Sequence, residues 1–405
     1  MAMVELLAPA GNMAKLKTAV HFGADAVYLG GKQFSLRAFS DNFAQEEIKE
    51  ALGFLHRQGK KGYVTVNIFS KNDDFEQIRE YLQFLQNVGA DAVIVSDPGV
   101  IALCREVAPA LPVHLSTQAN TLNKYSARFW ADAGVKRIVL ARELSLEEIR
   151  QIREFLGEGT ELEVFVHGAM CISYSGRCLL SNYLNGRDSN RGECVQVCRW
   201  RFDIREHGAE GDRLTMEEDA RGTYILNSKD LNLIRHLKEL IDAGANSFKI
   251  EGRMKSEYYV AAVVNSYRRA LDGALSGKPF DERLYDELKK AAHRNFTTGY
   301  LFGANEDTVN LQSSAPTSEY DFAAVVLGYD ERRGIKAMQR NRFFAGDELE
   351  VLSPDQNFNK VIKVEYMEDE EGNPATDAKL VQQILYIRSD IRLREYDMLR
   401  RKRAK

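Results

Sequence analysis

A short sequence motif that occurs four times limits this chain to folds in which helices and buried strands alternate. It reads FGADAVYLGG at 22–31, VGADAVIVSD at 88–97, AGVKRIVLARE at 133–143 and AGANSFKIEG at 243–252. In each copy a glycine just past a helix supplies the left-handed cap, and a continuous apolar run follows it. Such a run is typical of a parallel strand that is covered on both faces.

Further candidate strands lie at VELLAP (4–9), GYVTVN (62–67), VHLSTQ (113–118) and LEVFVHG (162–168), which brings the total to eight. The segments between the strands place apolar residues at the i, i+3, i+4 and i+7 spacing of an amphipathic helix. Eight strands that alternate with helices predict an α/β protein with a TIM-like (β/α)8 barrel. An open doubly wound sheet is the alternative, although no G-x-G-x-x-G follows the first strand.

The spacing of these elements divides the chain into three parts, since 405 residues exceed what one core usually holds. We expect the barrel at 1–303, a polar linker at 304–317, and a small C-terminal antiparallel β-barrel domain of about six strands at 318–405. About eighty residues separate the seventh strand from the eighth, which predicts an insertion at about 169–245. Loops that follow barrel strands carry function, so the insertion should lie over the barrel mouth.

The insertion holds four of the five cysteines, Cys171, Cys178, Cys194 and Cys198. We find no secretory signal and no membrane-spanning run, and therefore expect a cytoplasmic protein with reduced thiols. Clustered thiols in that compartment favour a metal or redox site over disulfides, with buried neighbouring thiols as the alternative. A structural zinc usually takes two tight C-x2–4-C pairs, whereas these wide spacings favour an iron–sulfur cluster over zinc.

Polar side chains follow most of the predicted strands, at the mouth of the barrel. Four of them are cations that could receive a carboxylate or phosphate, although ion pairs at the rim would explain them equally well. His167 could be a ligand, a proton carrier or a strand-end histidine bonded to backbone. Ser145 and Asp97 precede helices and are expected to cap them. The candidate binding residues are Arg37, Asn67, Gln118, Asn120, Arg142, His167, Lys249, Glu251 and Arg253.

The net charge of −4 gives no general attraction to nucleic acid. Positive charge nevertheless gathers in the insertion and in the basic C-terminal stretch LRRKRAK. Solvated charge is the ordinary explanation of such a patch, and its position beside a candidate metal site points to an anionic partner. The arginines concerned are Arg177, Arg187, Arg191, Arg199 and Arg201. No G-x-S-x-G or H-E-x-x-H motif is present, so the sequence identifies no catalytic nucleophile.

The segment EVFVHGAMCISYSGRCLLS resembles the signature of the collagenase-like peptidase family U32. It is joined by ELLAPAG, GADAVYLGGKQFSLRA, LSTQANTLN, NGRDSNRGECVQVCRW, LNSKDLNLI, FKIEGRMKS and RNFTTGY, in the order of that family. These blocks span residues 5–300, and the section that ends in EYDMLRRKR resembles the small β-barrel that follows the catalytic domain in many members. The length, this section and the NGRDSNRGECVQVCRW block are most similar to the subgroup required for tRNA hydroxylation.

The resemblance implies a function in forming 5-hydroxyuridine at the tRNA wobble position, with prephenate as an associated metabolite. It also implies an iron–sulfur cluster, of the 4Fe–4S type, on Cys171, Cys178, Cys194 and Cys198. The anticodon region of tRNA would then be the partner of the arginine patch, together with a paralogous subunit or a second copy of the chain. The alternatives within the family are a peptidase, or an accessory protein for hydroxylating a ribosomal RNA cytidine or ubiquinone.

Overall fold

The computed structural model describes residues 4–36, 41–171, 173–174, 177–200, 228–303 and 316–403. The chain divides into two compact units, of which the first comprises Met1–Met13, Asp25–Met254 and His293–Pro316. The second comprises Ala14–Ala24, Lys255–Ala292 and Thr317–Lys405. The predicted linker at 304–317 lies almost entirely outside the described residues, and the predicted domain boundaries stay predictions. In the described part of the chain, no helix is long and apolar enough to cross a membrane.

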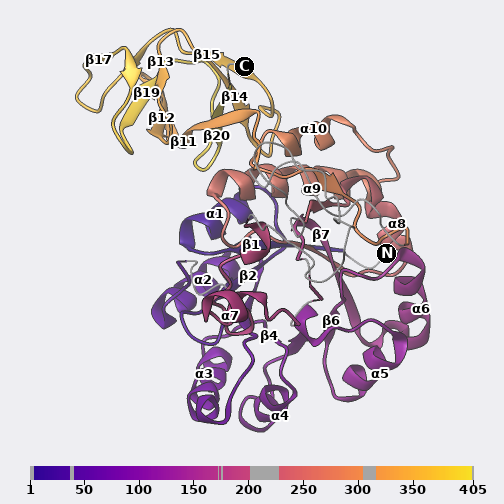
Figure 1. Ribbon diagram of the computed structural model, residues 1–405. Coiled ribbons are helices and arrows are strands. Elements are labelled where there is room, and N and C mark those ends of the chain that lie inside the picture. Colours follow the sequence, from indigo (N-terminus) through magenta and orange to yellow (C-terminus); the bar gives the residue numbers. More distant parts are fainter. Residues whose placement is uncertain are drawn as a thin grey trace, which may run out of the picture. The chain divides into compact units, whose positions relative to one another are not determined.

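Eight parallel strands of the first unit close into the predicted barrel (Figure 1). They are β1 (Glu5–Ala10), β2 (Ala26–Gly30), β3 (Lys61–Val66), β4 (Ala92–Val95), β5 (Val113–Leu115), β6 (Arg137–Val139), β7 (Glu161–Ala169) and β9 (Ser247–Ile250). Each strand pairs with the next in this order, and β9 pairs with both β1 and β7, which closes the ring. The apolar runs are buried as expected for parallel strands, and every residue of β2 is buried.

Helices alternate with these strands in the first unit, and each helix buries apolar residues along one face. They are α2 (Gln45–Arg57), α3 (Phe75–Asn87), α4 (Pro98–Val107), α5 (Lys124–Asp132), α6 (Leu146–Leu156) and α8 (Leu237–Asp242). Both predicted caps are confirmed: the Asp97 carboxylate accepts from the Gly99 N–H at 2.8 Å, and Ser145 Oγ accepts from the Glu148 N–H at 3.3 Å. Short 3-10 turns connect the elements at η1 (Asn72–Asp74), η2 (Thr117–Ala119), η3 (Gly157–Gly159) and η6 (Ile234–His236).

The segment after β7 leaves the barrel and returns to it. Its described part contains α7 (Leu180–Asn185), η4 (Ser189–Arg191) and η5 (Val197–Arg199). It returns through β8 (Asp230–Asn232), which pairs antiparallel with the end of β7, and β10 (Phe296–Thr297) pairs parallel with β8. β8 and β10 were not predicted from the sequence, because neither DLN nor FT contains the continuous apolar run that marks the barrel strands.

The second unit contains α1 (Met13–His21), α9 (Glu257–Leu275), α10 (Arg283–Lys289) and ten antiparallel strands among its described residues. They are β11 (Tyr320–Asp330), β12 (Gly334–Gln339), β13 (Phe343–Phe344), β14 (Glu348–Leu352), β15 (Val361–Lys363), β16 (Met367–Glu368), β17 (Pro374–Ala375), β18 (Asp377–Ala378), β19 (Ile384–Ile387) and β20 (Met398–Lys402). Eight of them form one sheet, and β13 pairs with β18. This half-barrel confirms the predicted small antiparallel domain, with more strands than the six expected.

A buried arginine joins α10 to the sheet of the second unit. The Arg400 side chain is fully buried, and its Nη2 donates to Glu287 Oε2 at 2.6 Å and to Asn359 Oδ1 at 2.7 Å. Its Nε donates to Glu350 Oε1 at 2.8 Å. Burial alone would raise the pKa of Glu350, but Arg400 and Lys290 outweigh it and lower that pKa. The Glu350 carboxylate is therefore ionised and depends on Arg400 and Lys290 for compensation.

We expect Arg400→Met to destabilise the protein by about 3 kcal/mol or more, because it leaves two buried carboxylates with one cation. Chemical denaturation of the full chain measures this loss. The matched control is Arg403→Met, since Arg403 pairs with Asp321 while its side chain remains 53% exposed. Exposed pairs contribute less than about 1 kcal/mol. Equal losses in the two variants would show that the cluster does not stabilise the second unit.

Candidate active site

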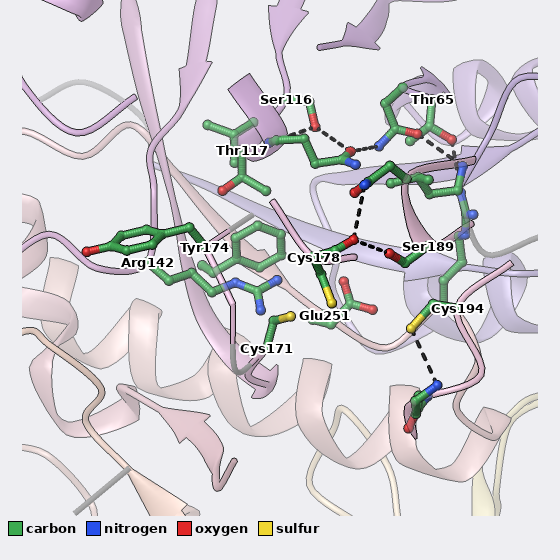
Figure 2. A pocket seen from close by; sticks show the side chains of 18 of the residues that line it. Thr65, Ser116, Thr117, Arg142, Cys171, Tyr174, Cys178, Ser189, Cys194 and Glu251 are labelled. Carbon is green, nitrogen blue, oxygen red and sulfur yellow. Dashed lines mark hydrogen bonds between the residues drawn. The ribbon is translucent and has the colours of Figure 1, made fainter. Parts of the chain in front are cut away.

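The described residues within 171–200, which include the four clustered cysteines, are called the cysteine segment. This segment and the ends of the barrel strands line one cavity of about 170 Å³ (Figure 2). Its lining contains all four clustered cysteines. It also contains six of the nine predicted binding residues, namely Asn67, Gln118, Arg142, Lys249, Glu251 and Arg253. These side chains come from both sides of the barrel, because the carboxyl ends of its parallel strands all face the same mouth.

Arg253 is fixed at the wall of this cavity by hydroxyl groups. Its side chain is buried, and Nη1 donates to Ser35 Oγ at 2.8 Å and to Thr65 Oγ1 at 2.9 Å. Gly30 makes room for it, since a Cβ at that position would lie 2.3 Å from Nη1. The two hydroxyl groups thus fix the position of the guanidinium at the cavity wall.

Lys249 belongs to a buried ion network inside the barrel. Its Nζ lies 2.7 Å from Glu163 Oε1, and Glu163 Oε2 lies 3.1 Å from Arg137 Nη1. Burial raises the pKa of Glu163, but Lys249 and Arg137 together outweigh it and lower that pKa. The carboxylate therefore offsets part of the Lys249 charge, which makes Lys249 a weaker anion-binding group than the sequence analysis expected.

Arg142 brings a second guanidinium to the cavity. It stacks on Phe165 with its Cζ 4.1 Å from the ring centroid, and its Nη1 donates to the Ala169 carbonyl at 2.9 Å. Its buried Nε has no hydrogen-bond partner in the part of the chain that the structure describes. Figure 2 shows the Arg142 guanidinium directed toward the space into which Cys171 and Glu251 also point. Two arginines and one partly neutralised lysine thus share the cavity with Glu251, and the arginines are groups that could receive an anion.

An amide pair lines another part of the wall. Asn67 Nδ2 donates to Gln118 Oε1 at 2.8 Å, and Ser116 Oγ donates to the same oxygen at 3.2 Å. Asn67 Oδ1 accepts from the Leu36 N–H at 3.2 Å. These bonds fix the orientation of both amides, which can offer donors and acceptors to a polar ligand.

The four cysteines surround the same space. Figure 2 shows the thiols of Cys171, Cys178 and Cys194 grouped around it, and Cys198 also lines the cavity. Burial is the main cause that raises the pKa of Cys198, the Arg199 charge lowers it, and the other three cysteines raise it further. Among the residues that the structure describes, no group of His, Cys, Asp or Glu is arranged to hold a single metal ion. Cys104 is buried in α4, as expected of a core residue.

Hydrogen bonds tie the cysteine segment to the loop after β3. Arg191 pairs with Asp74 at 2.9 Å and donates to the Phe69 carbonyl at 2.7 Å. The neighbouring Asn190 accepts from the Phe69 N–H at 2.9 Å and donates through Nδ2 to the Cys178 carbonyl at 3.1 Å. Arg191, a predicted partner of an anion, is thus engaged in holding Cys178 in place.

We expect Arg191→Gln to loosen the cysteine segment without unfolding the barrel. The partly exposed ion pair contributes about 1 kcal/mol or less, so thermal unfolding should change little while metal retention falls. The hydrogen bond from Arg191 lowers the pKa of Asp74, so the pair stabilises fully above the usual Asp range and is lost as the pH falls through the lowered pKa. Metal analysis after dialysis measures the effect. Arg79→Gln, which breaks the exposed pair with Glu106, is the control.

The remaining candidates that the structure describes do not line the cavity. His167 is buried with its ring centroid 5.7 Å from that of Phe296, and it is not among the residues that line the cavity. Asn120 adopts a left-handed conformation at the end of η2 and is also absent from the described lining. Arg177 and Arg187 are exposed, and Arg199 is half-buried beside Cys198. Arg37 and Arg201 lie outside the described residues.

Several lining residues were not predicted. Thr65, Tyr174, Ser189 and Asn190 contribute polar or aromatic groups to the wall. The signal for Thr65 was available, because it alternates with Val64 and Val66 in β3 and must therefore face the opposite side of the strand. No local pattern marks the other three, since they lie in the irregular cysteine segment.

Comparison with known proteins matches the same two parts of the chain. Residues 11–311 match the model of peptidase family U32, and residues 318–400 match the model of the peptidase family U32 C-terminal domain. A "tRNA hydroxylation protein" of Bacillus subtilis is 43% identical over 98% of this chain and 94% of its own length. One of Escherichia coli is 40% identical over 91% of this chain and 90% of its own. The solved U32 peptidase Mk0906 is 15% identical, covers 63% of this chain and 96% of its own, and has a TM-score of 0.43. The chain belongs to peptidase family U32.

Proposed function

We propose that this protein takes part in hydroxylating the wobble uridine of tRNA to 5-hydroxyuridine. The observation that carries the proposal is the meeting of four thiols, two arginines and an amide pair in one cavity at the barrel mouth. The similar proteins of two bacteria that are named for tRNA hydroxylation support it. Replacing the C5 hydrogen of uracil with a hydroxyl is a two-electron oxidation, which side chains alone do not perform.

The donor set of the cavity fits an iron–sulfur cluster, of the 4Fe–4S type, better than zinc. Cys171, Cys178, Cys194 and Cys198 supply only thiols, and thiolates are the usual ligands of such clusters. A structural zinc usually takes two tight C-x2–4-C pairs, and of these four cysteines only Cys194 and Cys198 have such a spacing. When bound, the cluster would supply one-electron transfer. The Gln196 N–H, 3.4 Å from Cys194 Sγ, would stabilise the thiolate.

The remaining polar groups would bind and orient two substrates. Arg253 and Arg142 would hold a small carboxylate-bearing metabolite, for which prephenate is our candidate, because each guanidinium is fixed by its own contacts. Asn67 and Gln118 can donate to uracil carbonyls and accept from its N–H. A base can reach these groups only when it is unstacked from its neighbours, as the wobble base of an anticodon loop can be.

Proteolysis is the alternative that the family description raises. A protease of the nucleophilic type needs a hydroxyl or thiol within reach of a base such as histidine. The cavity has hydroxyls and thiols, but its described lining contains no histidine, and His167 packs on Phe296 instead. The cavity therefore supports hydroxylation better than proteolysis.

Mass spectrometry of tRNA nucleosides tests the proposal. A strain that lacks this protein should lose 5-hydroxyuridine and its derivatives from wobble positions, and the intact chain should restore them. Unchanged nucleosides in that strain, together with peptide hydrolysis by the purified protein, would establish the peptidase alternative.

A further inference from the structure

The cysteine segment exposes large aromatic rings to solvent. The exposed fraction is 86% for Tyr183, 52% for Tyr174 and 45% for Trp200. Rings of this size contribute most to stability when they are buried, so several exposed ones on a single segment usually mark a binding surface.

One of these rings lines the candidate active site, and the other two lie on the segment that carries the cysteines. Tyr174 lines the cavity and is half-exposed, which places it at the mouth. Tyr183 lies on α7, which packs against η5, and the Trp200 N–H donates to the Val197 carbonyl of η5 at 2.9 Å. The segment that positions the cysteines thus also positions the rings.

The charge of the segment favours a polyanion over an apolar protein partner. Residues 171–200 contain four arginines and two acidic residues, a net charge of +2, although the whole chain carries −4. Arg177 and Arg187 are exposed, and Arg191 pairs with Asp74. Aromatic rings interspersed with exposed arginines are the chemistry that binds single-stranded nucleic acid, because bases stack on the rings and phosphates contact the cations.

We infer that Tyr174, Tyr183 and Trp200, with Arg177 and Arg187, form a surface that binds unpaired nucleotides of RNA. This inference rests on the proposed function and deepens it. A base that enters the cavity loses stacking with its neighbours, and the exposed rings replace that stacking for the nucleotides on either side. Tyr174, at the mouth, contacts the base nearest the cavity.

Binding of a fluorescently labelled anticodon stem-loop RNA to the full-length, anaerobically purified protein tests the inference. At one fixed salt concentration, Tyr174→Leu, Tyr183→Leu and Trp200→Leu should each weaken affinity by about 5- to 150-fold, the equivalent of about 1–3 kcal/mol per stacked base. Tyr174→Phe and Tyr183→Phe should keep wild-type affinity because they keep the ring. Phe129→Leu is the matched control, since Phe129 is 63% exposed on α5 and lies outside the cysteine segment.

The arginines are tested by salt dependence. Arg177→Gln and Arg187→Gln should each reduce the slope of log affinity against log salt by about one, as expected for a lost phosphate contact. A fully paired RNA duplex should bind more weakly than the stem-loop, because it offers no unstacked base.

Wild-type RNA affinity in all three leucine variants would overturn the inference, and so would equal binding of the duplex. Leucine variants that keep RNA affinity but lose a bound protein would assign the surface to that protein instead. Each of these results leaves the proposed function intact if the wild-type chain restores 5-hydroxyuridine to the deletion strain. Failure of that restoration would overturn the proposed function whatever the RNA affinities are.

Discussion

Cys198→Ser should remove most of the iron from the protein and abolish wobble hydroxylation. Serine cannot replace a thiolate ligand, because its hydroxyl stays protonated at neutral pH and iron–sulfur clusters are held by thiolates. The other thiols line the same cavity and cannot complete the set alone. Removal of an outer partner of a metal site typically lowers metal affinity by about 10- to 100-fold. Removal of a direct ligand should therefore lower the affinity for iron by about 100-fold or more.

Iron and sulfide analysis of anaerobically purified protein measures this effect. Cys104→Ala is the matched control. Of the five cysteines, Cys104 alone lies outside the cluster, and it is buried in α4. It should keep its iron and lose only some stability. Full iron content in Cys198→Ser would show that this cysteine is not a ligand.

The second large effect is expected at Arg253. Arg253→Lys keeps the charge but loses the planar fork that contacts Ser35 and Thr65 and would receive a carboxylate. We expect the apparent affinity for the anionic metabolite to fall by about 30-fold, which corresponds to about 2 kcal/mol. Arg150→Lys is the control, because the Arg150 side chain is 42% exposed and its pair with Glu147 should contribute less than about 1 kcal/mol.

Gly30→Ala tests the same site without changing any charge. The added Cβ would lie 2.3 Å from Arg253 Nη1 and 2.4 Å from Ser35 Oγ, so the guanidinium must move. Hydroxylation in the complemented deletion strain should fall with this variant as it does with Arg253→Lys. Full activity in both variants would exclude Arg253 as a binding group for the anion.

The barrel was predictable because its signals are local and repeated. The glycine after each helix and the apolar run that follows it mark four of the eight strands, and the buried strands bear this out. The caps at Asp97 and Ser145 were predictable for the same reason, since a cap depends on residues within one turn. β8 was missed because its pairing with β7 is set by tertiary contacts across a long excursion.

The candidate site was predictable in position but not in detail. Strand ends identified Asn67, Gln118, Arg142, Lys249, Glu251 and Arg253, which the barrel brings to one cavity. The pairing of Lys249 with Glu163 could not be read from the sequence, because the two residues lie on strands that meet only when the barrel closes. The anchoring of Arg191 by Asp74 joins segments far apart in the chain and was hidden for the same reason.

The most direct test measures 5-hydroxyuridine in tRNA from a deletion strain complemented with cysteine variants. The wild-type chain and Cys104→Ala should restore the nucleoside, whereas serine at Cys171, Cys178, Cys194 or Cys198 should not. Equal expression of all variants, checked by immunoblot, ensures that the difference comes from the site. Full restoration by the four serine variants would contradict the claim that these thiols serve the hydroxylation.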